Sequence, residues 1–359
     1  MNAISISRVA AWTGLMTLAL GAQAALAEPL VYVALGGENK IVAVDAAKDE
    51  IVDTITGLAA VHGLAGTPDG QFLIAGSFAT RVSGGEAVAK PAGVSEDEHV
   101  AHHGAAASAD AKSAATEVST VSVVRTADGS VVRRIDVPGA VHHVAVSGDG
   151  RFAVVTHPND GSISAIDLGS YEVVATVATG PLPNYAAFAP SGDRLYVSNA
   201  GNDTVSEIDT ERWIVRSNTV VGGSPEHIVL SRDGVTLYVN NVDDGTVSIV
   251  DVGDQTVVKT IRVGTTLHGI GLSDDGGTLF VAVLGGDKVV AVDLATGAER
   301  SVSLAPAPYH LAVVRGTGKL YVSSANEPKI WVIDQRDLRG HGEIQIGGKG
   351  HQMVQSAGG

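Results

Sequence analysis

The stretch that decides the fold is SPEHIVLSRDGVTLYVNN, residues 224–241. It contains a Pro-x-His start, a short apolar run, a polar turn that ends in Asp233-Gly234, and a second apolar run with Tyr238-Val239. Two more short runs follow at 246–251 and 256–261, each bounded by Gly, Asp or Asn. Four short strands within about 40 residues are the pattern of one propeller blade.

The same unit recurs along the chain. Its third run ends in an acid each time, at Asp45, Asp167, Asp209, Asp251, Asp293 and Asp334, which predicts a turn-capping role. The units start at His62, His142, Asn184, Glu226, His268, His310 and His351. The steps between these starts are 80, 42, 42, 42, 42 and 41 residues. Only the first step is irregular, and an insertion between Phe78 and about Thr116 explains it.

The two ends of the chain complement each other. Residues 30–56 supply three strands, at 30–34, 40–45 and 50–55, with no first strand before them, and residues 351–354 supply a first strand with no followers. Joined, they complete a blade and remove the exposed sheet edges that invite aggregation. We therefore predict an all-β fold, a seven-bladed β-propeller with four-stranded blades that is closed by the N- and C-terminal strands.

Composition indicates an exported chain. Residues 1–27 read as a signal peptide, with Arg8 as the only charge, an apolar middle and Ala25-Leu26-Ala27 before the cleavage point. Residues 28–359 then form one propeller domain, which we expect to be a periplasmic monomer without membrane insertion. There is no cysteine to supply a disulfide or a thiolate ligand. A net charge of −15 disfavours binding to nucleic acid and to anionic lipid.

At this point the chain resembles a known family. The pattern Pro-x-(Gly/His)-apolar, Asp-Gly, Leu-Tyr-Val-(Ser/Thr)-Asn and Val-x-x-Ile-Asp is similar to the YVTN-repeat seven-bladed propellers. That family includes scaffolds, binding proteins and a few enzymes, so the resemblance implies fold more than function. More narrowly, the export signal, a His-rich loop and a His-lined centre resemble the periplasmic zinc-chaperone propellers associated with zinc ABC transporters.

Histidine gathers where the blades should converge. Inner strands line the central channel of a propeller, so the seven unit starts are expected to meet at one mouth of it. Three units also have a histidine directly before their apolar triplet, at His143, His227 and His310. The seven unit starts are expected to form a first ring around the channel, and the residues that follow them a second ring. The assignment to these rings is open by one residue in two units. Counting back from Asp-Gly places His310 in the first ring, whereas counting back from the apolar triplet places Tyr309 there, and His351 has the same ambiguity.

Three readings of these rings remain. Imidazoles and one carboxylate suit zinc, copper(II) or nickel, and the mature chain has no sulfur ligand except Met353. We expect zinc as the bound ion, with copper(II) as the alternative. The second reading is a structural channel whose histidines bind ordered water, and the third is a catalytic role. The candidate ligands are His62, His142, His143, Glu226, His227, His268, His310 and His351.

The insertion carries its own candidates. Residues 79–116 have few large apolar side chains and are expected to form a mobile loop. Within it, residues 95–103 hold three acids together with His99, His102 and His103, which suggests metal capture rather than a neutral linker. His157 and His341 are interpreted as turn residues.

Three functions follow. The first is a zinc carrier that hands its ion to the periplasmic metal-binding protein of an ABC transporter. The second is a scaffold without metal that binds another exported protein. The third is an enzyme similar to propeller lactonases or lyases. We expect no enzyme, because no Ser-His-Asp order or clear nucleophile is present.

Overall fold

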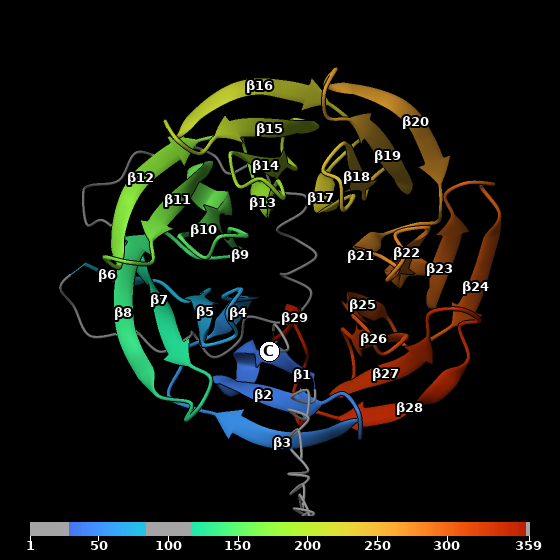
Figure 1. Ribbon diagram of the computed structural model, residues 1–359, viewed down its shortest axis with the longest axis horizontal. Coiled ribbons are helices and arrows are strands. Elements are labelled where there is room, and N and C mark those ends of the chain that lie inside the picture. The colour runs from blue at the N-terminus through green and yellow to red at the C-terminus, as the bar shows by residue number, and fades with distance from the viewer. Residues whose placement is uncertain (1–28, 84–116, 357–359) are drawn as a thin grey trace, which may run out of the picture.

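Residues 29–83 and 117–356 are described by a computed structural model of the chain. They form seven antiparallel sheets around one axis, in the order of the chain (Figure 1). The predicted seven-bladed propeller is therefore confirmed. The signal peptide expected at 1–27 and most of the expected loop, including 95–103, lie outside the described residues.

The strands are grouped here by blade, from the innermost to the outermost. Blade A holds β29 (Met353–Gln355), β1 (Leu30–Leu35), β2 (Lys40–Asp45) and β3 (Glu50–Ile55). Blade B holds β4 (Val61–Gly66), β5 (Phe72–Ser77), β7 (Glu117–Arg125) and β8 (Val131–Pro138), with β6 (Arg81–Val82) also on β7. Blade C holds β9 (Val144–Val146), β10 (Phe152–His157), β11 (Ser162–Asp167) and β12 (Glu172–Ala178). Blade D holds β13 (Pro183–Phe188), β14 (Arg194–Asn199), β15 (Thr204–Asp209) and β16 (Ile214–Val220).

The remaining blades follow the same plan. Blade E holds β17 (Pro225–Leu230), β18 (Thr236–Asn241), β19 (Thr246–Asp251) and β20 (Thr256–Arg262). Blade F holds β21 (Leu267–Leu272), β22 (Thr278–Val283), β23 (Lys288–Asp293) and β24 (Glu299–Ser303). Blade G holds β25 (Pro308–Val314), β26 (Lys319–Ser324), β27 (Lys329–Asp334) and β28 (Gly340–Gln345). Three short 3-10 turns, η1 (Gly36–Glu38), η2 (Pro158–Asp160) and η3 (Leu284–Gly286), follow second strands.

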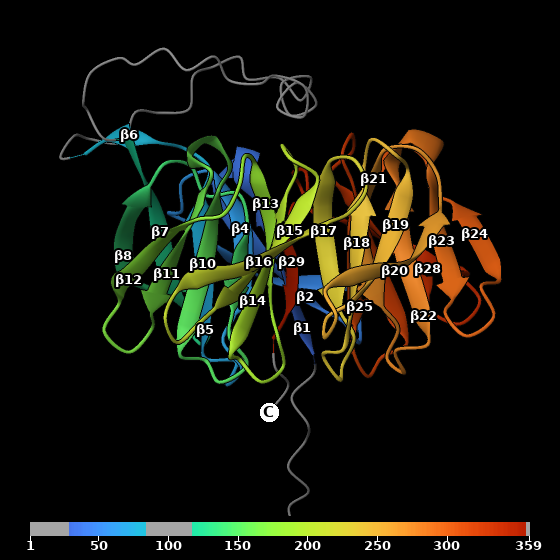
Figure 2. The ribbon, with the colours of Figure 1, turned by 90° about the horizontal axis from the view of Figure 1, so that it is seen from above.

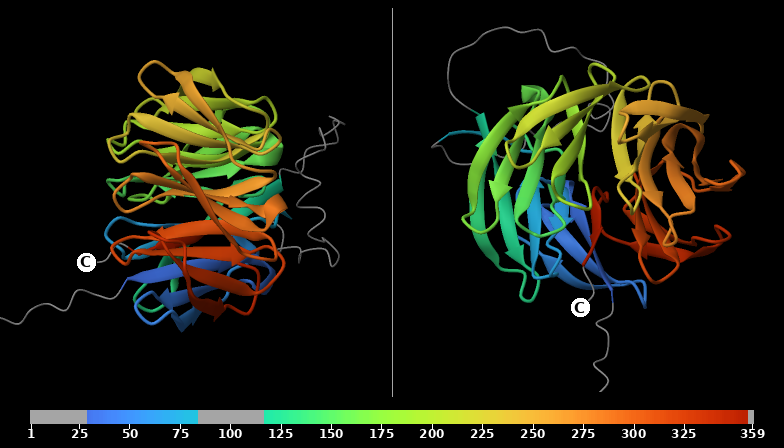
Figure 3. Two further views of the ribbon diagram at one scale, coloured as in Figure 1. Left: turned by 90° about the vertical axis from the view of Figure 1, so that its right-hand side faces the viewer. Right: turned by 45° about the horizontal axis from the view of Figure 1, so that its top comes forward.

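The core lies between blades rather than inside one sheet. Seven apolar clusters fill the seven blade interfaces. Second and third strands are buried almost throughout, whereas fourth strands such as β20 are mostly exposed. A strand covered on both faces needs apolar residues on both, which explains the Val-, Ile- and Ala-rich runs. The side views show the sheets standing next to one another around the ring (Figures 2 and 3).

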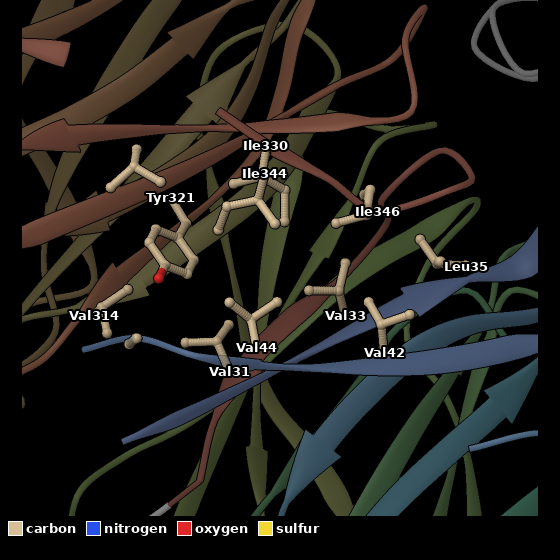
Figure 4. Close-up of a cluster of buried hydrophobic side chains, with 12 residues drawn as sticks. Val31, Val33, Leu35, Val42, Val44, Val314, Tyr321, Ile330, Ile344 and Ile346 are labelled. Carbon is tan, nitrogen blue, oxygen red and sulfur yellow. The ribbon is translucent and has the colours of Figure 1, made fainter. Parts of the chain in front are cut away.

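Ring closure uses both chain ends, as predicted. In blade A, β29 pairs antiparallel with β1, so that Met353 faces Val33. Valines of β1 and β2 then pack against Tyr321, Ile330 and Ile344 of blade G (Figure 4). A polar clamp reinforces this interface, because Asp49 accepts a hydrogen bond from the Tyr321 hydroxyl and pairs with Lys319 at 2.7 Å.

Candidate metal centre

The first strands are irregular where their side chains reach the channel. In β17 the pairing with β18 skips from Pro225 to Ile228, so Glu226 and His227 lie in a β-bulge. Blades D, F and G show the same shift between the corresponding residues of β13, β21 and β25. A bulge bends the strand and redirects its side chains. It therefore turns two consecutive residues per blade toward the axis.

A left-handed residue precedes the bulge in five blades. These residues are Ala60, Leu182, Ser224, Thr266 and Ala307, with φ between 40° and 53°. None is glycine, so this conformation costs energy and must be held by neighbours.

In three places the preceding blade supplies that support. Ser224 N–H donates to Asp203 Oδ1 (2.9 Å), Ala307 N–H to Asp287 Oδ1 (2.7 Å), and Ala60 N–H to Asn39 Oδ1 (2.7 Å). The strand starts that bear His62, Glu226 and His310 are thus fixed relative to the preceding blade.

The structure settles the register of the two rings. In every blade, one residue of the first strand pairs with the fourth residue of the second strand, and this residue marks the same position in all seven. The pairs are Met353–Val33, Leu64–Ala75, Val144–Val155, Ala186–Val197, Ile228–Val239, Ile270–Val281 and Leu311–Val322. Counting back two residues gives the first ring: His62, His142, Asn184, Glu226, His268, Tyr309 and His351. Counting back one gives the second: Gly63, His143, Tyr185, His227, Gly269, His310 and Gln352. The count to Asp-Gly, which placed His310 in the first ring, is wrong, because the bulge and not the turn sets the register.

Three histidines from adjacent blades form the tightest group in the described part of the chain. The ligand nitrogens of His227, His268 and His310 all lie within 4.8 Å of one another, and all three side chains are buried. Their ring centroids are 4.4 Å (227–268), 5.0 Å (227–310) and 4.6 Å (268–310) apart. Tetrahedral zinc binds imidazole nitrogens at about 2.0–2.1 Å, so each ring would need to move inward by less than about 1 Å. These three residues are called the triad below.

The triad fits a metal ion in chemistry as well as in spacing. His310 Nε2 is buried and makes no hydrogen bond with the described residues. Burial, reinforced by His227 and then His351, holds the pKa of His310 well below its ordinary value. The ring is therefore neutral at neutral pH, as a metal ligand must be.

A carboxylate and a tyrosine complete this side of the channel. Glu226 Oε2 lies 4.0 Å from His268 Nε2, and Glu226 is buried. The Tyr309 ring lies 3.8 Å from the ring of His268, and burial with Glu226 nearby raises the pKa of the Tyr309 hydroxyl. Glu226 thus places a carboxyl group beside the triad, and Tyr309 packs against the ring of His268.

The opposite side of the channel gathers three more histidines. The ring of His62 lies 4.6 Å from that of His142 and 4.5 Å from that of His351. His62 Nδ1 donates to the carbonyl oxygen of His142 (2.8 Å), and His142 Nδ1 donates to that of Asn184 (3.2 Å). A carbonyl oxygen only accepts, so Nδ1 carries a proton in both rings. Burial lowers the pKa of His62 to about 4.

His143 is held differently. It stacks on Tyr185 at 3.5 Å, and its Nδ1 accepts the Ala186 N–H at 3.2 Å. Its Nε2 lies 2.8 Å from the Gln352 side-chain amide, which also accepts the Leu64 N–H and donates to the Val144 carbonyl. Both ring nitrogens of this candidate ligand therefore contact protein groups, an arrangement typical of a structural histidine.

Two histidines outside the rings have clear roles. His157, interpreted from sequence as a turn residue, is fully buried at the end of β10, where its ring bonds to Ala140 O (3.1 Å) and Ser164 Oγ (2.9 Å). It replaces the asparagine that makes the matching bonds in β14 and β18, Asn199 to Ser206 and Asn241 to Ser248. His341 is exposed on β28. The repeated acids cap turns as predicted; Asp209 Oδ1, for example, accepts two backbone N–H groups.

Three channel residues were missed from the sequence. Tyr185 and Gln352 share the ring position of His227. Phe78, directly after β5, lies 5.3 Å from the His62 ring and 6.4 Å from that of His142. Counting every blade to its apolar triplet, the count that placed Tyr309 in the first ring, would have found the first two. His99, His102 and His103 lie outside the described residues.

Comparison with known proteins agrees with this architecture. A family profile described as "Lactonase, 7-bladed beta-propeller" matches residues 152–323. The chain is thus a seven-bladed propeller, and its part from 152 to 323 is similar to this family. No curated protein matches it at a significant level. Among the residues described, no helix is long and apolar enough to cross a membrane.

Solved structures extend the likeness to the whole ring. The chain is similar to a periplasmic gluconolactonase of Pseudomonas aeruginosa, with a TM-score of 0.69, 15% identity, and coverage of 92% of this chain and 99% of that one. A putative 6-phosphogluconolactonase of Bacteroides fragilis gives a TM-score of 0.70 at 14% identity, with coverage of 92% and 99%. Hydrazine synthase of Kuenenia stuttgartiensis gives a TM-score of 0.62 at 19% identity, with 79% of each chain covered. Identities this low support the fold alone.

Proposed function

We propose that the protein is an exported zinc carrier that holds its ion on the triad in the centre of the propeller. The observation that carries this proposal is the spacing of three buried, ligand-competent imidazoles within 4.8 Å. Three protein ligands leave a fourth position, which Glu226 or an incoming ligand can occupy. An open position permits ligand exchange, and a carrier needs exchange to release its ion.

The donor set favours zinc over copper(I). The chain has no cysteine, so no thiolate is available, and copper(I) prefers sulfur ligands. Copper(II) is the alternative, because it binds a nitrogen and oxygen set more tightly than zinc in vitro. The periplasm is the proposed location, and the periplasmic metal-binding protein of an ABC transporter is the proposed recipient.

The test is calorimetric titration of the mature, untagged protein with zinc. A submicromolar site that weakens with acid is expected, because ligand histidines must be neutral, and the lowered pKa of His310 moves this loss below the ordinary histidine value of 6.5. The absence of any submicromolar site would reject the proposal. Deleting residues 95–103, proposed to capture the ion, should slow loading more than it weakens equilibrium affinity.

Lactone hydrolysis is a second candidate, because the matching family profile carries a lactonase description. The same channel would serve it: an ion on the triad would supply a polarised water, and Glu226, 4.0 Å from His268, would be the candidate base. The test is a panel of lactones with and without added zinc. Turnover that disappears in Glu226→Gln would support this function, and its absence across the panel would remove it.

A further inference from the structure

A cavity lies between blades A and B, and no histidine is among the described residues that line it. Its volume is about 250 Å³, which is space for about eight water molecules. Strands of blade B and the connection at 57–59, which leads from blade A, form its walls (Figure 1). Two arginines, Arg81 and Arg134, line it together with one acid, Asp136. This cavity is called the arginine pocket below.

The corresponding position in other blades is filled by an asparagine. In blade E, Asn241 ends the second strand and donates from Nδ2 to Thr246 Oγ1 (3.0 Å) and to Ser248 Oγ (2.8 Å) of the third strand. Asn199 makes the same two bonds in blade D, at 3.1 Å and 2.9 Å. An asparagine amide therefore occupies this position and links two hydroxyl groups.

Blade B has a serine at the same place. Ser77 pairs with the start of β4 as Asn241 pairs with the start of β17. Its short side chain bonds to the backbone of Ala79 and does not reach β7. The two hydroxyls at the positions that an asparagine links elsewhere are those of Thr120 and Ser122. Both residues line the pocket, and their hydroxyls make no hydrogen bond within the described part of the chain.

A backbone donor lacks its acceptor for the same reason. In blade E, Asn241 Oδ1 accepts the N–H of Gly222, three residues before Pro225 (3.1 Å). The equivalent residue next to blade B, three residues before Val61, is Leu58. Leu58 is 2% exposed, and its N–H has no acceptor among the described residues. A buried N–H without an acceptor costs free energy, so the pocket favours a ligand that accepts hydrogen bonds.

The two arginines add positive charge and further donors. Arg134 lies opposite Ser122 in the pairing of β8 with β7, and it donates to Gly57 O at 3.2 Å. Arg81, whose side chain is 19% exposed, pairs with Asp136. A guanidinium group has five N–H donors, and within the described residues each of these two makes only that one hydrogen bond. Two cations and one acid leave the pocket with one net positive charge, in a chain whose net charge is −15.

We propose that the arginine pocket binds a small organic carboxylate. A carboxylate only accepts hydrogen bonds, and it forms its strongest ones with guanidinium groups. The donors that converge on the pocket are the hydroxyls of Thr120 and Ser122, the N–H of Leu58, and the guanidinium groups of Arg81 and Arg134. The ligand would lie where blades D and E have an asparagine side chain. This site is independent of the zinc proposal, because none of its residues is a candidate zinc ligand.

The experiment is a saturation-transfer NMR titration of the metal-free protein with succinate. Succinate should bind with a dissociation constant of about 1 mM or lower, and succinamide, its uncharged analogue, at least about tenfold more weakly. Ser77→Asn introduces the asparagine of blades D and E, so it should remove succinate binding and raise the melting temperature. Arg134→Gln should weaken succinate binding at least about tenfold, because it removes a charge-assisted hydrogen bond.

The control lies in the corresponding groove between blades D and E. Arg262→Gln changes an arginine of that groove, where Asn241 fills the equivalent space, and should leave succinate binding unchanged. Zinc affinity should be equal in Arg134→Gln and the parent, which separates this site from the carrier function. If Ser77→Asn does not fold, Arg134→Gln, at an exposed position, is sufficient for the test. Absence of succinate binding by the parent at about 10 mM, or equal binding by the parent and either pocket variant, would overturn the proposal.

Discussion

The two sides of the channel use the same repeat positions and hold their histidines differently. In blades E, F and G the triad is buried and close together, with Glu226 beside it. In blades B and C, His62 and His142 instead donate to backbone carbonyls, and His143 accepts the Ala186 N–H and stacks on Tyr185. The repeat supplies seven equivalent positions, and the choice of residue at each decides which side brings three imidazoles close enough to hold a metal ion.

The largest expected effect tests this difference directly. His268→Ala removes a triad ligand and should weaken zinc affinity by at least about 100-fold, because loss of even an outer-shell group costs about 10- to 100-fold. The matched change His142→Ala on the other side should weaken affinity by less than about tenfold. Calorimetry on both variants checks this. Equal losses would show that the two sides form one site.

Acid should destabilise the metal-free protein. The pKa of His62 is about 4 in the folded state against 6.5 as its ordinary value, so the unfolded state binds more protons between these values. The contribution of His62 is complete above pH 6.5 and is lost as pH falls toward 4, at most about 3 kcal/mol. Burial also lowers the pKa values of His143 and His310. Urea unfolding at pH 7.5, 6 and 5 measures this.

The control for the acid effect is His62→Gln, which should show a shallower loss of stability across the same range. A free energy of unfolding that does not change between pH 7.5 and 5 would contradict the burial of neutral histidines in the channel.

A glycine next to the triad should also matter. A Cβ on Gly269 would lie 2.5 Å from Leu311 N and 2.8 Å from Tyr309 O, which are backbone atoms of the neighbouring strand. Gly269→Ala should therefore push His310 out of place and destabilise the fold by about 2 kcal/mol, a typical overpacking cost. Gly340→Ala, where a Cβ meets nothing within 4 Å, is the matched control. Equal melting temperatures for the two variants would show that the contact at Gly269 is relaxed.

The smallest effect concerns ring closure, which places His351. Asp49→Asn weakens the clamp to Lys319 and Tyr321 and should lower the free energy of unfolding by about 1 kcal/mol. Asp254→Asn, at an exposed position, should have no measurable effect. Thermal unfolding of both variants provides the measurement; a melting temperature of Asp49→Asn equal to that of Asp254→Asn would mean that apolar packing alone closes the ring.

Local pattern predicted the fold well. The expected strand at 30–34 is β1 at Leu30–Leu35, and the strand at 256–261 is β20 at Thr256–Arg262. Short alternating runs and turn residues are local signals, so a single sequence is enough to find them.

The site could be predicted only in part. The sequence named all three triad members but could not separate them from His62, His142 and His351, because that difference depends on β-bulges and on distances between blades. Misplacing His310 came from counting to the turn when the bulge fixes the register. His157 was misread as a turn residue because its partner Ser164 lies on the next strand. There the His157 ring makes a bond that an asparagine makes in other blades.

The most direct test of the central claim is the zinc affinity of the mature protein with and without the triad. Calorimetry should show a submicromolar site in the parent that disappears in the double variant His227→Ala, His268→Ala and persists in His341→Ala. Retention of that tight site by the double variant would contradict the assignment of the ion to the triad.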